Sequence, residues 1–385
     1  MKFYKKSRIK IVFVFVCFLI SGFACKALGA AEPNQAVRII PNEETPAILE
    51  LIANAIRENY EQIKTWYGEI DKKITWVHTG SLAEELFRNA TDAKGAVPKA
   101  LLQKAEDKIT FAVDANKNLV YVDTLRDKPS NYFNYNTGDN VGNSGPSPIC
   151  STIIARSDFI LKAHSNSFEK GTGRLLHKRA IKEPLKSEPR TGWYKLADIS
   201  DPRRAFFPGA GFTWDTLDNL IKRINKYGKI EFDGYKFTIE EHKKGDNIEY
   251  KIIEPAVVNM EQSRPEHYAI ITMIFSSRDG FNMIYWDVAT GSSMVFQEHT
   301  WEYELVDGIY LPKRRIIKIY DSNGTVTDEY DSTYNNNKVN QEVSPETFTY
   351  NNLGLKNGDK FIDKIEGKEY KYQDANLVFI ADVNK

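Results

Sequence analysis

Apolar and polar residues alternate with a period of two through much of the second half of the chain. The segments YKFTIEE (residues 235–241) and TWEYELV (residues 300–306) both place apolar side chains at every second position. Such a period puts successive side chains on opposite faces of a β-strand. Asp307-Gly308 and Asn323-Gly324 separate extended runs and suit tight hairpin turns. The pattern therefore predicts an antiparallel meander whose strands have one apolar and one polar face.

Two segments carry apolar residues at helical spacing. The first begins at Thr45-Pro46, a capping hydroxyl followed by proline at the first helical position, and extends to about residue 64. The second spans residues 213–228 and ends at Gly228, which suits a left-handed cap. Together these elements predict an α+β fold, in which amphipathic helices cover a curved, largely antiparallel sheet that forms an incomplete barrel. The apolar concave face is compatible both with a solid core and with the wall of a cavity.

Residues 1–31 have the composition of a secretory signal peptide. Basic residues precede the apolar run IVFVFVCFLISGFA (residues 11–24), and small residues follow it. The run is shorter than the roughly 20 residues that a membrane-spanning helix needs. Cleavage after Ala30 or Ala31 fits the small-residue rule, whereas cleavage before Cys25 would permit lipidation of that cysteine. We expect export to the periplasm or cell envelope, with membrane anchoring if Cys25 is lipidated.

Residues 32–385 predict a single large domain. Beyond the apolar run the only cysteines are Cys25 and Cys150, so a packed core and not a disulfide framework must hold the domain together. Residues 129–148 are rich in Asn, Gly, Ser and Pro and predict a long polar loop. Residues 338–385 form a C-terminal extension of the domain.

The balance of charge changes when the leader is removed. The full chain has 52 basic and 52 acidic residues, but residues 1–31 hold six of the basic residues and none of the acidic ones, which leaves 46 against 52. A mildly acidic protein has no global electrostatic attraction to nucleic acid, so we expect no nucleic-acid partner.

The sequence has no familiar catalytic or cofactor-binding motif. It contains no GxSxG, Walker or GxGxxG motif and no paired cysteines, and its six histidines do not occur at metal-ligand spacing. Cys150 has no base near it in sequence, and pairs such as Asp198 and Asp201 arise readily among 52 acidic residues. We therefore expect no metal, no cofactor and no enzymatic activity.

Three segments give the chain a family resemblance. They are DPRR (residues 201–204) before the second predicted helix, VDGIYLPKR (residues 306–314) on a late strand, and residues 338–372. With the leader, the first helix and the meander, they resemble the LolA/LolB-like superfamily of periplasmic lipoprotein carriers, and especially its large exported bacterial relatives of the planctomycete-like kind. The resemblance implies a half-barrel whose apolar face holds the acyl chains of lipids or lipoproteins. This chain is much longer than a carrier of that family.

The apolar concave face is the expected ligand site. The large apolar side chains of the strand faces are candidates, as are those of a Gly-rich loop that suits a lid or a hydrophobic staple. They are Phe237, Tyr250, Trp301, Tyr303 and Leu305 on strands, with Phe212 and Trp214 on the loop.

Three functions are compatible with these features. The favoured one is an exported, non-enzymatic protein that binds a lipid or an acylated peptide or lipoprotein. The alternative is a cell-envelope scaffold or protein-interaction module with a solid core, whose partner is an envelope protein bound transiently. A hydrolase of envelope glycans is the third hypothesis. None of the three hypotheses predicts an oligomeric state.

The basic run PKRR (residues 312–315) is interpreted as the protected start of an edge-like strand. Basic side chains fall on both faces of this strand, which argues against a one-sided anion-binding patch. Proline cannot donate to a ladder, and charged residues with proline hinder edge-to-edge pairing. The acidic residues Glu302 and Glu304 are expected to pair with this run across strands.

Overall fold

The structure is a computed structural model of the chain. It describes residues 37–383 except for 127, 145–148, 166–177, 185–216, 219–220, 223–224, 226–230, 233–234, 258–267 and 291–293. The predicted signal peptide with Cys25 and the candidate residues Phe212 and Trp214 lie outside the described residues. The described residues of the second predicted helix are helical, namely residues 217, 218, 221, 222 and 225.

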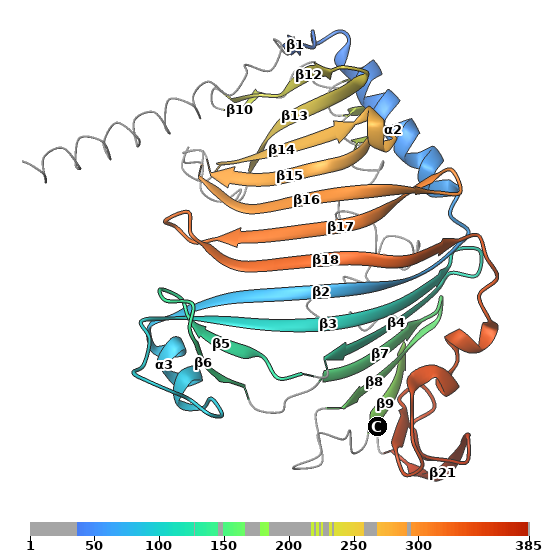
Figure 1. The fold of residues 1–385 in the computed structure, drawn as a ribbon. Helices are drawn as coiled ribbons and strands as arrows, with labels where there is room; N and C mark the ends of the chain where they lie inside the picture. The colour runs from blue at the N-terminus through green and yellow to red at the C-terminus, as the bar shows by residue number, and fades with distance from the viewer. Residues whose placement is uncertain are drawn as a thin grey trace, which may run out of the picture.

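Nineteen strands form one continuous sheet (Figure 1). Its first part has the hydrogen-bonded order β1 (Val37–Ile39), β12 (Thr238–Lys244), β13 (Asn247–Val257), β14 (Tyr268–Ser276), β15 (Asn282–Thr290), β16 (Val295–Val306), β17 (Ile309–Tyr320) and β18 (Val326–Val339). Strand β18 pairs with β2 (Thr65–Thr79), and the order continues through β3 (Ala100–Asp114), β4 (Leu119–Arg126), β7 (Ile149–Ala155), β8 (Phe159–Ser165), β9 (Arg179–Pro184), β19 (Lys360–Asp363), β20 (Lys368–Gln373) and β21 (Asn376–Asp382). A separate pair consists of β10 (Glu231–Phe232) and β11 (Tyr235–Lys236).

The predicted antiparallel meander is confirmed from β12 to β18. Every neighbouring pair in that range is antiparallel, and among the described strands only β9 and β19 pair in parallel. Asp307 and Gly308 have φ values of 51° and 82°, as the hairpin turn between β16 and β17 requires.

The fold is mainly β, and the expected α+β incomplete barrel is corrected to an open sheet. Among the described residues, the α-helices are α2 (Thr45–Glu61), which confirms the first predicted helix, α3 (Gly80–Arg88), and the helical residues within 217–225. The sheet is neither closed nor strongly curled (Figure 1). Strand β19 pairs with β9, so the strand order continues outward to β21 and does not return to β1. Strands β1 and β21 are therefore the two ends of an open sheet.

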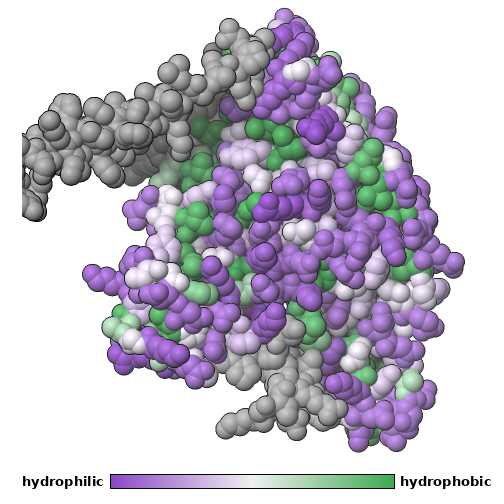
Figure 2. Space-filling model, viewed as in Figure 1, coloured by the Kyte–Doolittle hydropathy of each residue, from purple (hydrophilic) through white to green (hydrophobic). Residues whose placement is uncertain are grey.

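Side chains of β2 alternate between the two faces of the sheet. Trp66, Ile70 and Ile74 are buried on one face, which we call the inner face. Asp71 and Lys73 are exposed on the opposite, outer face. The face turned toward the viewer in Figure 2 is largely hydrophilic, as expected for a sheet that buries only one of its sides over the meander.

The basic run 312–315 lies within the sheet, so its interpretation as an edge strand is wrong. Strand β17 pairs with β16 along its length and with β18 from Arg314 onward. Pro312 precedes that second ladder and lies at a register shift, where a missing N–H is tolerated. The cross-strand pairing with Glu302 is confirmed, because Arg314 lies 3.6 Å from Glu302 and 2.9 Å from Asp331.

Strands β18 and β2 join the two halves of the chain. Asn340 connects the ends of both strands: its backbone N–H donates to Thr65 O (2.9 Å), its side-chain amide donates to Gln62 O (3.0 Å), and its Oδ1 accepts from Lys64 N (2.8 Å). Trp66 Nε1 donates to Asn337 Oδ1 at 2.9 Å, although 271 positions separate the two residues. These side-chain bonds hold the register of the junction.

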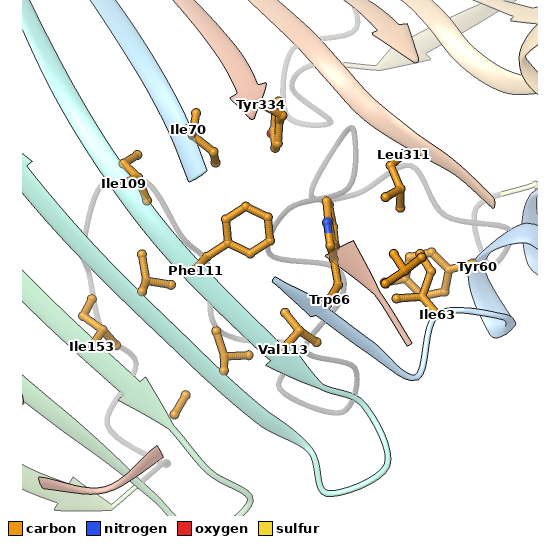
Figure 3. Packing of buried hydrophobic residues seen from close by; sticks show 14 of the residues in the cluster. Tyr60, Ile63, Trp66, Ile70, Ile109, Phe111, Val113, Ile153, Leu311 and Tyr334 are labelled. Atoms are coloured by element: carbon orange, nitrogen blue, oxygen red, sulfur yellow. The ribbon is translucent and has the colours of Figure 1, made fainter. Parts of the chain in front are cut away.

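An aromatic cluster on the inner face packs across the same junction (Figure 3). The rings of Trp66 and Phe111 meet edge to face at 4.9 Å between centroids, and the ring of Tyr334 lies 6.5 Å from both. Gly68 makes room for Phe111, because a Cβ at position 68 would lie 2.8 Å from the Phe111 ring. Strands β2, β3 and β18 each contribute one ring, so the cluster stabilises their alignment.

The C-terminal extension covers part of the outer face. The 3₁₀-helices η5 (Pro345–Phe348) and η6 (Tyr350–Leu353) bring Phe348 and Leu353 against β4, β7 and β8, and both side chains are buried there. Lys178 Nζ donates to Leu353 O at 2.9 Å. Phe348 and Leu353 of the extension therefore complete a buried core on this side of the sheet.

The long loop predicted at residues 129–148 contains a hairpin. Strands β5 (Asn131–Asn134) and β6 (Asn140–Asn143) pair with each other, and β5 pairs with β3 beside β4. Tyr132 and Val141 are buried against Phe87 of α3. The abundance of Asn and Gly conceals these strands in the sequence, because only one side chain from each is apolar and buried.

Phe348 allows a test of the role of the C-terminal extension. Phe348→Ala is expected to lower the free energy of unfolding by about 3–5 kcal/mol, because it leaves a cavity in a close-packed core. Phe379→Ala, in β21 of the same extension, should cost less than about 1 kcal/mol, because Phe379 is 52% exposed whereas Phe348 is 2% exposed. Urea unfolding measures both, and equal losses would contradict this account of the extension.

Candidate functional site

The strand register aligns side chains into a row that crosses the inner face from β12 to β3. Each residue in this row is the direct cross-strand partner of the next, and all but one are apolar or aromatic. At about 4.8 Å between neighbouring strands, the row extends over roughly 38 Å. We call it the apolar row, and its residues are Ile239, Ile252, Met273, Trp286, His299, Ile317, Tyr330, Ile74 and Ala105.

Burial changes along the apolar row. Leu49 and Ile52 of α2 pack in one cluster with its first residues, among them Ile252, which is fully buried. Farther along the row, Trp286 packs against the same cluster, and both Trp286 and Ile317 are only half-buried. The middle of the row therefore keeps apolar surface that the described part of the chain does not fully cover.

A polar row runs beside the apolar row, two residues away on each strand. Arg315, Ser332, Lys72 and Asp107 are successive cross-strand partners in β17, β18, β2 and β3. Arg126 of β4 completes the row, because its Nε and Nη2 donate to the two Asp107 oxygens at 2.6 and 3.1 Å. Lys72 and Asp107 are buried, which is costly for charged groups unless they are paired.

Lys72 titrates far from its ordinary range. Its residue is 4% exposed. Burial lowers the pKa of Lys72 to about 6; Asp107 opposes this shift, and the positive charges of Arg126 and Arg315 add to it. The amine is therefore mostly uncharged at pH 7. Asp107 and Arg126 offset each other, and Arg315 is a further cation of the polar row.

Four residues lie together where the two rows meet, and we call them the donor cluster: Trp286, His299, Trp301 and Arg315. The His299 ring lies 4.7 Å from the Trp286 ring and 5.5 Å from the Trp301 ring. The Arg315 guanidinium lies 5.7 Å from the Trp301 ring centroid. The indole N–H groups of Trp286 and Trp301 are buried and have no hydrogen-bond acceptor in the described part of the chain. Such a desolvated donor costs about 1–3 kcal/mol.

His299 contributes to this cluster as a neutral ring. Burial and then the positive charge of Arg315 lower the pKa of His299 to about 3. Its Nδ1 accepts a hydrogen bond from Arg315 Nη2 (3.3 Å), so the ring proton is on Nε2. The side-chain amide nitrogen of Gln297 lies 2.8 Å from Nε2. Both ring nitrogens therefore have a polar neighbour, whereas the two indole N–H groups have no acceptor among the described residues.

The structure brings together four of the candidate site residues named from the sequence. Phe237, Tyr250, Trp301 and Tyr303 all lie in or against the cluster beneath α2. The hydroxyl groups of two are bonded within the protein: Tyr250 donates to Glu241 Oε2 (3.3 Å) and Tyr303 to Met283 O (2.8 Å). Leu305 does not join this cluster and is 59% exposed.

Sequence reasoning missed Trp286, His299, Arg315 and Lys72. Lys72 is next to Lys73 in a run that suggests two solvated lysines. The alternation of side chains along the strand is the only sequence signal that places Lys72 on the buried face and Lys73 on the exposed face. Trp286 and His299 are neighbours through the β15–β16 register, which no local pattern encodes.

Two features are absent from the described residues. No group of three or more His, Cys, Asp or Glu side chains among them is placed to hold a metal ion. None of the described helices has the length and apolar character needed to cross a bilayer. Cys150, considered as a nucleophile from the sequence, is a buried free cysteine in β7.

The pH dependence of stability tests the burial of Lys72. The pKa of this amine is about 6 in the folded protein against an ordinary 10.5, so between these values the unfolded chain binds a proton that the folded protein does not. Lys72 therefore makes stability rise with pH in this window, by at most about 1.4 kcal/mol per pH unit. Lys72→Met should flatten the rise between pH 7 and pH 9 in urea unfolding.

Lys73→Met is the matched control, because Lys73 is the exposed neighbour on the outer face. It should keep the pH dependence of the unaltered protein. A Lys72→Met variant that keeps the full rise would show that Lys72 is protonated in the folded protein.

Two solved structures are similar in layout to this chain. No protein family and no curated protein matches the sequence. Among solved structures, the chain is similar to a DUF1329 family protein from Desulfovibrio piger, with 10% identity and a TM-score of 0.32 over 80% of this chain and 98% of that one. It is also similar to a domain named for outer membrane lipoprotein sorting, from Vibrio parahaemolyticus, with 9% identity and a TM-score of 0.31 over 79% of this chain and 97% of that one. These are likenesses of layout, and neither identifies a ligand.

Proposed function

We propose that this protein is an exported, non-enzymatic binding protein that holds the acyl chain of a lipid or an acylated peptide against the inner face of its sheet. The apolar row carries the proposal. It presents apolar side chains from consecutive strands in one direct line, and an acyl chain is a linear apolar ligand. The cell envelope is the proposed location, because the leader predicts export and acyl ligands are abundant there.

The burial pattern supports a ligand position in the middle of the apolar row. Leu49, Ile52 and Ala53 of α2 lie in one buried cluster with the first residues of the row, Ile239, Ile252 and Met273. Trp286 and Ile317 follow in the row and are half-buried. Removing their remaining surface from water stabilises a complex by about 25 cal/mol per Å² of apolar area.

The polar row supports the same proposal from the other side. An amphipathic ligand needs an apolar surface and a polar surface side by side, and the two rows supply them two residues apart on the same strands. The acidic outer-face residues of β16 are matched by basic residues of β17, as Lys318 is with Glu298 at 3.5 Å. The inner face is therefore the side with the unusual chemistry.

A pair of adjacent residues on β17 tests the proposal. Ile317 lies in the apolar row, and Ile316, the partner of Thr300 and Asp331, lies on the outer face. Ile317→Glu should weaken palmitate binding by at least roughly tenfold, because a charge must be desolvated where the chain lies. Ile316→Glu should leave binding unchanged. Calorimetric titration of the detergent-free protein measures both affinities.

The proposal also predicts what the purified protein carries. Organic extraction followed by mass spectrometry should release acyl species from the unaltered protein and far less from Ile317→Glu. Thermal unfolding of both variants checks that they are folded, and Ile317→Gln serves as a milder change. If the protein binds no palmitate and releases no acyl species, the proposal fails and a solid-core envelope scaffold becomes the better account.

A further inference from the structure

The donor cluster has an excess of hydrogen-bond donors over acceptors. Indole and guanidinium groups donate and cannot accept. His299 uses its single accepting nitrogen on Arg315, and the atom nearest its other ring nitrogen is the Gln297 amide nitrogen, at 2.8 Å. The two indole N–H groups remain desolvated without an acceptor in the described part of the chain. Trp301 is 4% exposed, so bulk water does not satisfy it.

The electrostatics of the cluster favour a negatively charged acceptor. The guanidinium of Arg315 lies over the Trp301 ring. After burial, its positive charge is the second cause that lowers the pKa of His299 and so disfavours a second positive charge. The carboxylates of β15 and β16 nearest in sequence, Asp287 and Glu298, are cross-strand partners on the opposite face. Asp107 of the polar row is already bonded to Arg126 by both oxygens.

We propose that the donor cluster is a carboxylate-binding site, in which the indole N–H groups of Trp286 and Trp301 donate to the two oxygens of a carboxylate that Arg315 attracts. Two neutral donors beside one cation suit this group, because each oxygen takes a charge-assisted hydrogen bond without a second buried positive charge. The ligand class is an acyl chain with a free carboxylate, such as a long-chain fatty acid.

The position of the cluster explains how such a ligand fits. Trp286 and His299 belong to the apolar row, while Arg315 belongs to the polar row. A carboxylate at the cluster places its chain at the start of the half-buried stretch that continues through Ile317 and Tyr330. This inference rests on the proposed function for the chain, but the carboxylate site can be tested without it.

Indole ¹⁵N NMR of the full chain gives the direct test. The probes are palmitate, hexadecanol of equal chain length, and hexanoate, whose short chain contributes little apolar contact. Trp286→Phe and Trp301→Phe assign the two resonances and remove one N–H each while keeping an aromatic ring. We expect palmitate and hexanoate, but not hexadecanol, to shift both indole proton resonances downfield. Each variant should weaken palmitate binding by roughly tenfold and weaken hexadecanol binding much less, because an aromatic ring remains for the chain to contact.

Trp66→Phe is the matched control. It removes an indole N–H that already donates to Asn337 within the aromatic cluster at the junction, so it should lower stability and leave palmitate affinity unchanged. Palmitate that binds without moving the two indole resonances overturns the carboxylate site and leaves the proposed function standing. If hexanoate shifts both resonances but the protein binds neither palmitate nor hexadecanol, the carboxylate site is supported and the proposed function is overturned. If neither carboxylate moves them, the site is overturned.

Discussion

The antiparallel pairing of β18 with β2 is the constraint on which the rest of the structure depends. It joins two halves of a chain whose partners at this seam are as much as 278 positions apart. Closing a contact of that length costs conformational entropy, and the seam offsets this cost with ladder bonds, the Asn340 contacts and the packing of Trp66, Phe111 and Tyr334. Both inner-face rows cross this seam, and they continue from β18 into β2 only because this register is held.

The inner face combines two chemistries that globular cores usually separate. One residue from each strand forms an apolar line, and two residues away the same strands place Arg315, Lys72, Asp107 and Arg126. Burying such groups costs more than packing isosteric apolar residues, so a core that served stability alone would not need them. A face that must receive a ligand with an apolar chain and an anionic head does need both. The neutral state of Lys72 and His299 limits the buried positive charge that this arrangement carries.

Local patterns in the sequence predict the elements better than they predict the site. The period of two identifies β12–β18, Thr45-Pro46 marks the start of α2, and Asp307-Gly308 marks a hairpin, because each depends on neighbours in the sequence. The composition of the β5–β6 hairpin is that of a loop, which conceals both strands in the sequence. The run at Pro312 resembles an edge because no local pattern encodes the pairing of Arg314 and Arg315 with β18. The donor cluster forms from β15, β16 and β17, and a shift of one residue in any register would turn a member to the outer face.

A diffraction structure of the protein with 12-bromododecanoate would test the central claim most directly, because the bromine marks the end of the chain by its anomalous signal. The account predicts a carboxylate within hydrogen-bonding distance of the indole nitrogens of Trp286 and Trp301, with the bromine along the apolar row near Ile317 or Tyr330. A ligand bound on the outer face, or an apolar row covered entirely by the protein's own side chains with no ligand present, would contradict it.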